Sequence, residues 1–344
     1  MIISMRRGAT KEQVEHICKR IEDLKFKVHS IQGEERVVIA AVGTGDVTHA
    51  IESLASSPEV ESAVKISAPY KLVSRQVKKE RTVVTVANGG SFGGDEFGVV
   101  AGPCSVETEE QIMSSAEQVA KSGAKFLRGG AYKPRSSPYS FQGLEEKGLK
   151  LLRKAGDATG LAVVTEVMTV MNVDLVAEYA DVLQIGARNI QNYPLLKEVG
   201  RVNRPVVLKR GLCATLEELL LSAEYILSNG NPNVILCERG IRTFETATRN
   251  TLDIQAVPVL RQMTHLPIVV DPAHSSGMRS IIPALTRATA AVGADGMMLE
   301  MHPDPEKAWS DGAQSLTFDE YAKMMDELQP YVELWKKERA RKQD

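Results

Sequence analysis

The sequence is poor in cysteine and has no long apolar runs. Its 344 residues include only 4 cysteines, too few and too widely spaced for the disulfide framework of a small secreted protein. No apolar run is long enough to span a bilayer, and the short one at the start does not resemble a signal peptide. We therefore expect a cytoplasmic protein with reduced thiols and no membrane partner.

The sequence also lacks an excess of either charge. It has 42 Lys and Arg against 44 Asp and Glu, a formal net charge of −2. This balance argues against a broad surface for nucleic acid, so any anion site must be local. Neither a P-loop nor a Rossmann glycine pattern is present. The length allows one large domain together with a small one.

Residues 1–68 predict a small domain of their own. Thr10 precedes a helical pattern that carries Val14, Ile17 and Ile21 on one face. Strand-like runs and a second short helix complete the order βαββαβ, which is typical of a ferredoxin-like domain. The domain carries no catalytic constellation. A docking or oligomerisation module and a small-ligand sensor both remain open.

The sequence pattern of residues 98–330 predicts a (β/α)8 TIM barrel, so the chain is expected to be an α/β protein. Eight short apolar runs alternate with helical stretches at a mean spacing of about 28 residues, near the repeat of such barrels. The runs begin at 98, 125, 162, 182, 205, 234, 267 and 296. A doubly wound sheet is disfavoured, because polar residues follow nearly every run rather than one switch point. The pattern of residues 69–97 predicts a connector with a β-hairpin. Residues 331–344 resemble a frayed basic helix and are expected to form a solvated C-terminal tail.

The ends of the predicted strands suggest a metal site. Barrel active sites lie at the carboxyl ends of the strands, and strand 8 pairs with strand 1 when the barrel closes. Cys104, His274, Glu300 and Asp311 follow strands 1, 7 and 8. Such a mixed set of donors favours manganese, iron, cobalt or zinc over magnesium. Taken singly, Cys104 fits a small buried residue, His274 a helix cap and Asp311 a turn.

A second group at the strand ends is cationic. The segment 128–143 carries three cations and no carboxylate. Guanidinium and ammonium groups bind phosphates and carboxylates, and the whole set suffices for two phosphorylated groups. The alternative is that some of the cations form ion pairs with Glu166, Glu238 or Asp271. The cations concerned are Arg128, Lys133, Arg135, Arg188, Lys209, Arg239 and Arg279. A metal beside phosphates suggests sugar-phosphate or enolpyruvate chemistry.

Several motifs resemble those of 3-deoxy-D-arabino-heptulosonate 7-phosphate (DAHP) synthase. The stretches are AGPCSVE, LRGGAYKPRSSPYSFQG, QIGARNIQN, LKRG, ILCERGIRTFE, DPAHSSG and EMHPDPEKAWSDGAQSL. More narrowly, they look like the class with an N-terminal ferredoxin-like extension, and the likeness runs from Met1 to about Leu328. The resemblance implies a metal-dependent transferase that condenses phosphoenolpyruvate with erythrose 4-phosphate, giving DAHP and phosphate. This is the first step of the shikimate pathway to aromatic amino acids.

The resemblance also implies roles for individual residues. The expected metal is manganese, and iron, cobalt and zinc are the alternatives. Its ligands would be Cys104, His274, Glu300 and Asp311. The phosphoenolpyruvate site would comprise Arg128, Lys133, Gly186, Ala187, Arg188, Lys209 and Arg239. The erythrose 4-phosphate site would comprise Arg135, Ser136 and Arg279, with serine at 136 in place of the more common threonine. Lys133 would donate a proton, and Glu166 and Lys209 would position water.

The resemblance further implies a homotetramer and feedback control by an aromatic amino acid at the N-terminal domain. The nearest alternative function is 3-deoxy-octulosonate 8-phosphate synthase, which uses arabinose 5-phosphate. Pro134 and the N-terminal domain argue against it. A Schiff-base aldolase using Lys209 or Lys133, and a non-catalytic ligand-binding regulator, are the more distant alternatives.

Overall fold

The computed structural model describes residues 1–341 except 33–36, 44–45, 66–68, 89 and 136. It divides into two compact units. The first comprises Met1–Arg81 with Gln262–His265, and the second comprises Thr82–Arg261 with Leu266–Asp344.

The first unit has the predicted ferredoxin-like fold. Its elements are β1 (Ile2–Met5), α1 (Lys11–Asp23), β2 (Lys27–Gln32), β3 (Val37–Val42), α2 (Val47–Ala55) and β4 (Val60–Val64). The strands form an antiparallel sheet in the order β2-β3-β1-β4. Thr10 and Gln13 form a capping box at the start of α1. Ile17 and Ile21 of this helix pack into one core with Ile3 and Ile39 of the sheet.

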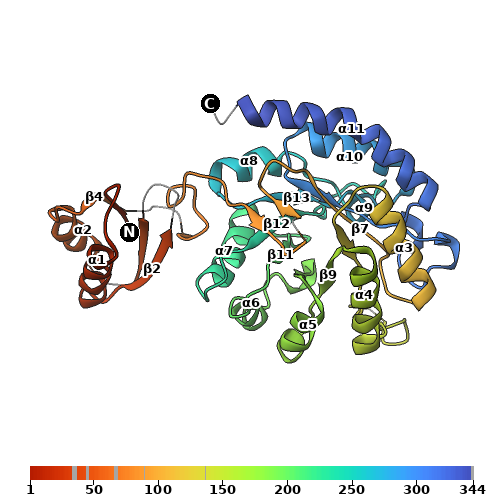
Figure 1. Ribbon diagram of the computed structural model, residues 1–344, viewed down its shortest axis with the longest axis horizontal. Coiled ribbons are helices and arrows are strands. Elements are labelled where there is room, and N and C mark those ends of the chain that lie inside the picture. The colour runs from red at the N-terminus through yellow and green to blue at the C-terminus, as the bar shows by residue number, and fades with distance from the viewer. Residues whose placement is uncertain (33–36, 44–45, 66–68, 89, 136, 342–344) are drawn as a thin grey trace. The chain divides into compact units, whose positions relative to one another are not determined.

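The second unit contains the predicted closed barrel of eight parallel strands (Figure 1). The strands are β7 (Gly98–Ala101), β8 (Phe126–Arg128), β9 (Ala162–Glu166), β10 (Val182–Ile185), β11 (Val206–Lys209), β12 (Val234–Glu238), β13 (Ile268–Val270) and β14 (Gly296–Met298). The barrel closes where Met298 of β14 pairs with Val100 of β7. Each strand coincides with one of the eight apolar runs, because strands buried on both faces are apolar throughout.

A small hairpin contributes to the core of the barrel. It consists of β5 (Val84–Thr85) and β6 (Ser91–Phe92), and it lies within the predicted connector. Val84 and Phe92 pack against Val100, Phe126 and other buried residues of the strands. The second unit therefore begins at Thr82, and the rest of the connector belongs to the first unit.

Helices follow the strands. They are α3 (Glu109–Lys121), α4 (Glu145–Thr159), α5 (Val173–Tyr179), α6 (Tyr193–Val199), α7 (Leu216–Leu227), α8 (Ala256–Met263), α9 (Pro272–Ser276), α10 (Ile282–Ala291) and α11 (Phe318–Arg341), with single 3-10 turns η1 (Val170–Asn172), η2 (Ala187–Asn189), η3 (Arg279–Ile281), η4 (Pro305–Lys307) and η5 (Gly312–Gln314). None of the described helices is both long enough and apolar enough to cross a membrane.

The C-terminal segment is helical, as predicted, but it is not wholly solvated. Residues 331–341 continue helix α11 past Pro330. Trp335 and Arg339 are buried, and Arg339 Nη1 lies 2.7 Å from Asp295 Oδ1. The many charges of this segment concealed the two side chains that attach it to the barrel.

Candidate active site

A cavity of about 220 Å³ is lined by residues at the carboxyl ends of the barrel strands. Most of the predicted site residues line it: Arg128, Lys133, Arg135, Glu166, Gly186, Ala187, Arg188, Lys209, Arg239, His274 and Asp311. Cys104 and Glu300 do not line the cavity but contact residues that do: Cys104 contacts Lys133 and Asp311, and Glu300 contacts Arg128. Ser136 lies outside the described residues.

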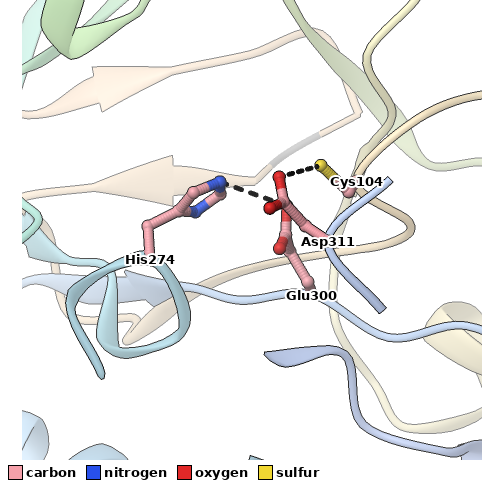
Figure 2. Close-up of side chains that lie close together, drawn as sticks. All are labelled: Cys104, His274, Glu300 and Asp311. Atoms are coloured by element: carbon pink, nitrogen blue, oxygen red, sulfur yellow. Dashed lines mark hydrogen bonds and ion pairs between the residues drawn. The ribbon is translucent and has the colours of Figure 1, made fainter. Parts of the chain in front are cut away.

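The four predicted metal ligands meet at one side of this cavity (Figure 2). Their ligand atoms all lie within 4.8 Å of one another. Cys104 Sγ is 3.1 Å from Asp311 Oδ2, and His274 Nε2 is 3.3 Å from Glu300 Oε1. A thiol, an imidazole and two carboxylates supply four donors at the spacing of a divalent-metal site. The residues present therefore fit such an ion.

Asp311 reaches the cluster through an unusual backbone conformation. Its φ of 50° and ψ of 35° lie in the left-handed region, which few residues other than glycine adopt. Gly312 follows, and a Cβ there would lie 2.1 Å from the Pro305 carbonyl oxygen. Strain of this kind concentrates at functional sites.

Asp271 orients the imidazole of His274. Its Oδ2 lies 2.7 Å from His274 Nδ1, which assigns the proton to Nδ1 and leaves the Nε2 lone pair facing the cluster. The same oxygen is 2.5 Å from Lys209 Nζ. Burial alone would raise the pKa of Asp271, but His274 and Lys209 outweigh it and hold that pKa well below its usual value.

Cys104 and Lys133 form a second close contact at the cluster. Lys133 Nζ donates to Cys104 Sγ at 2.8 Å and to the Cys104 carbonyl oxygen at 3.0 Å. Burial raises the pKa of the thiol to about 12, with Glu300 adding to the rise and Lys133 opposing it. Burial alone would lower the pKa of Lys133, but Cys104 and Glu300 raise it, which favours a charged ammonium.

One of the three cations of segment 128–143, Arg128, has an acidic partner outside that segment. Arg128 Nη1 lies 2.6 Å from Glu300 Oε1, and both side chains are buried. Burial alone would raise the pKa of Glu300, but His274 and Arg128 lower it strongly. The partner comes from the far end of the chain, so the local sequence could not reveal it.

Arg188 and Arg239 face the cavity without an ion pair among the described residues. Arg239 Nη2 donates to the His274 carbonyl oxygen at 3.2 Å, and burial lowers the pKa of Arg239. At Gly186 a Cβ would lie 2.1 Å from Glu166 Oε1, so glycine lets that carboxylate lie against the chain. This region keeps cationic and backbone groups available to an anion.

The two predicted erythrose 4-phosphate arginines are placed differently. Arg135 lines the cavity and donates to the carbonyl oxygens of Phe141 and Trp309, each at 3.1 Å. Arg279 is not among the residues that line it. Its guanidinium lies 3.9 Å from Glu306 and 3.7 Å from Glu320.

Five polar residues of the site region were not predicted. Arg210 pairs with Glu238 and Asp253, each at 2.8 Å, so Glu238 serves Arg210 and not Arg239. Arg242, Arg249 and Asn250 line the cavity, and Gln314 contacts Glu300. The arginines in IRTFETATRN after β12 are a sequence signal for Arg242, Arg249 and Asn250, but not for Arg210 or Gln314.

Comparisons with known proteins agree with the motifs. A family model described as the DAHP synthetase I family matches residues 76–334. A second model, described as the DAHP synthase ferredoxin-like domain, matches residues 1–68. The phospho-2-dehydro-3-deoxyheptonate aldolase of Thermotoga maritima is 51% identical over 328 residues, which are 95% of this chain and 96% of that protein. A crystal structure of the Thermotoga maritima DAHP synthase has 49% identity and a TM-score of 0.77, covering 97% of this chain and 98% of that one.

The octulosonate alternative is more distant. A 2-dehydro-3-deoxyphosphooctonate aldolase of Syntrophotalea carbinolica is 32% identical over 257 residues, which are 69% of this chain and 92% of that protein. The predicted enzyme class and reaction are thereby confirmed over this alternative. The chain belongs to the DAHP synthetase I family.

Proposed function

We propose that the cavity at the carboxyl ends of the barrel strands is where this DAHP synthase joins phosphoenolpyruvate to erythrose 4-phosphate. The observation that carries the proposal is the shared wall of the cavity. There a four-donor cluster of metal-ligand type adjoins cations from several strand ends. Barrel enzymes hold their reacting groups at this end.

Phosphoenolpyruvate is assigned to the part of the cavity around Arg188 and Arg239. The two guanidinium groups have no acidic partner among the described residues, so they are available to phosphate and carboxylate oxygens. Gly186 and Ala187 supply backbone at the same place. Arg128, Lys133 and Lys209 complete the assigned set. Erythrose 4-phosphate is assigned to Arg135, with Ser136 and Arg279 carried by the resemblance alone.

The four-donor cluster is assigned to a divalent ion, with manganese first and iron, cobalt or zinc as alternatives. When bound, such an ion supplies a Lewis acid for the aldehyde oxygen. The fixed cations orient both substrates and stabilise developing charge.

Lys133 is assigned as the proton donor. A new bond forms between the methylene carbon of phosphoenolpyruvate and the aldehyde carbon, and the aldehyde oxygen takes up a proton. The Lys133 ammonium is buried and its pKa is raised, so it is charged and close to the cluster. Glu166 and Lys209 are assigned to the water that adds at the central carbon before phosphate leaves.

The N-terminal domain is assigned a regulatory role, with an aromatic amino acid, tyrosine or phenylalanine, as the effector. The domain match over residues 1–68 supports a separate module at this end of the sequence. A homotetramer in the cytoplasm is proposed from the family resemblance.

One assay tests these assignments together. Turnover is measured with phosphoenolpyruvate and either erythrose 4-phosphate or arabinose 5-phosphate, with and without a chelator and each aromatic amino acid. We expect turnover with erythrose 4-phosphate that the chelator abolishes and manganese restores. Turnover that survives the chelator would refute the metal assignment, and preference for arabinose 5-phosphate would favour the octulosonate reaction.

A further inference from the structure

Gln314 is a buried amide beside the candidate metal cluster, and only 3% of its surface is exposed. It lies at the end of η5, three residues after Asp311. Its Nε2 donates to Glu300 Oε2 at 2.6 Å, and its Oε1 accepts from Arg249 Nη1 at 2.9 Å. Since the carboxylate only accepts and the guanidinium only donates, the orientation of the amide is determined by its two partners.

The Gln314 amide donates to Oε2 of Glu300, whereas two other groups contact Oε1. Glu300 Oε1 faces Arg128 at 2.6 Å and His274 at 3.3 Å. Glu300 is fully buried, so without Gln314 its Oε2 would lose its hydrogen bond and have no solvent to replace it. The amide therefore fixes the rotation of the Glu300 carboxylate.

Arg249 extends the arrangement to a second candidate ligand. Its Nη1 donates to Gln314 and lies 3.4 Å from Asp311 Oδ1. Its backbone N–H donates to the Ser276 carbonyl oxygen at 2.9 Å, two residues after His274. The segment after β12 is thus connected to two of the four candidate ligands by one guanidinium and one amide.

We propose that Gln314, oriented by Arg249, is a positioning residue that sets the affinity of the cluster for its divalent ion. This inference rests on the proposed function, because it assumes that the four-donor cluster binds a metal. Groups that hold metal ligands typically change metal affinity by about 10- to 100-fold when they are removed. Neither residue is itself a ligand.

The test is a manganese titration of the full-length chain after chelator treatment, followed by the electron paramagnetic resonance signal of free Mn²⁺. Gln314→Leu keeps the size of the side chain and removes both hydrogen bonds. We expect the dissociation constant for Mn²⁺ to rise about 10- to 100-fold. The matched control is Gln329→Leu in α11, whose amide donates to the Met325 carbonyl oxygen, and it should leave the constant unchanged.

A second variant keeps the test decisive if Gln314→Leu does not fold. Arg249→Met alters a side chain that is 39% exposed, and it should weaken Mn²⁺ binding by a smaller factor. If the two residues act as one unit, the double variant will lose less than the product of the two single effects. The metal-free variants should be less stable than the parent, because a buried polar group loses its partner, and circular dichroism checks that they are folded.

The outcomes separate the inference from the proposed function. Stoichiometric Mn²⁺ binding by the parent with no more than a twofold change in both variants would overturn the positioning role and leave the proposed function standing. No Mn²⁺ binding by the parent would overturn both.

Discussion

Arg128 Nη1 lies 2.6 Å from Glu300 Oε1, which brings a residue assigned to phosphoenolpyruvate against a residue assigned to the metal. The Arg128 side chain is 5% exposed and that of Glu300 is fully buried. Solvent therefore compensates neither charge. The two candidate subsites are electrostatically coupled through this pair.

Replacing Arg128 by Met should destabilise the metal-free protein more than the manganese-bound protein. Removal of one partner of a buried pair typically costs about 3–5 kcal/mol, because the other charge is left uncompensated. A bound cation near Glu300 would offset part of that loss. The free energy of unfolding is measured in urea with and without Mn²⁺.

The matched control for this experiment is Arg153→Met. Arg153 pairs with Asp181 at 2.7 Å on a different part of the barrel unit, so its effect should not depend on Mn²⁺. Equal stabilisation of the parent and of Arg128→Met by Mn²⁺ would contradict the coupling.

Lys133→Ala should reduce kcat by about 10²- to 10⁴-fold, the range for loss of a positioned proton donor. Steady-state turnover is measured with saturating substrates, and circular dichroism checks the fold. The control is Lys150→Ala on α4, whose side chain is 59% exposed and pairs with Glu146 one turn away. Near-normal turnover of Lys133→Ala would exclude Lys133 as the proton donor.

The alternation of apolar runs was sufficient to predict the barrel and to bring its candidate metal ligands into one neighbourhood. Cys104 and Glu300 follow strands β7 and β14, and closure of the barrel makes these strands neighbours. That step needs only the number of strands and their order. The ferredoxin-like unit was equally predictable, since its helices and strands carry clear periodic patterns.

Contacts made by irregular segments could not be predicted in the same way. Gln314 reaches Glu300 because Asp311 adopts a left-handed conformation, and no periodic pattern encodes that turn. Arg128 and Glu300 are 172 residues apart, so the local sequence does not show their pairing. Trp335 and Arg339 were hidden among the charged residues around them.

Deletion of residues 1–68 should leave catalysis in place and remove inhibition by an aromatic amino acid. This cut follows the matched domain and keeps residues 71–81, where Arg75 N–H donates to the Met263 carbonyl oxygen at 3.0 Å. Unchanged inhibition of the shortened chain would refute a sensor role for this domain.

His265 should make the stability of the protein sensitive to acid. Burial lowers its pKa to about 4, although the hydrogen bond from Nε2 to the Leu72 carbonyl oxygen at 2.8 Å opposes the shift. The unfolded chain binds the proton more readily, so stability is complete above about pH 6.5 and declines as the pH falls toward 4. The full loss is on the order of 3 kcal/mol.

The check on His265 is a comparison of unfolding free energies at pH 7 and pH 5 for the parent and His265→Gln. Glutamine retains a donor for the Leu72 carbonyl oxygen but does not titrate, so the variant should lose less stability on acidification. An equal loss in both proteins would show that other groups cause it.

Arg339→Met should destabilise the barrel unit even though the residue lies within five positions of the C-terminus. Arg339 Nη1 is 2.7 Å from Asp295 Oδ1, and both side chains are buried. Asp295 keeps Arg261, whose Nη2 lies 2.8 Å from its other oxygen, so its charge remains partly compensated. We therefore expect a loss of about 1.5–3 kcal/mol, the range for a hydrogen bond to a charged group.

Thermal unfolding measures this loss, and the control variant is Arg341→Met. Arg341 is an exposed arginine in the same last turns of α11. Equal stability of these two variants would show that Arg339 adds no stability and that residues 331–341 behave as a solvated tail.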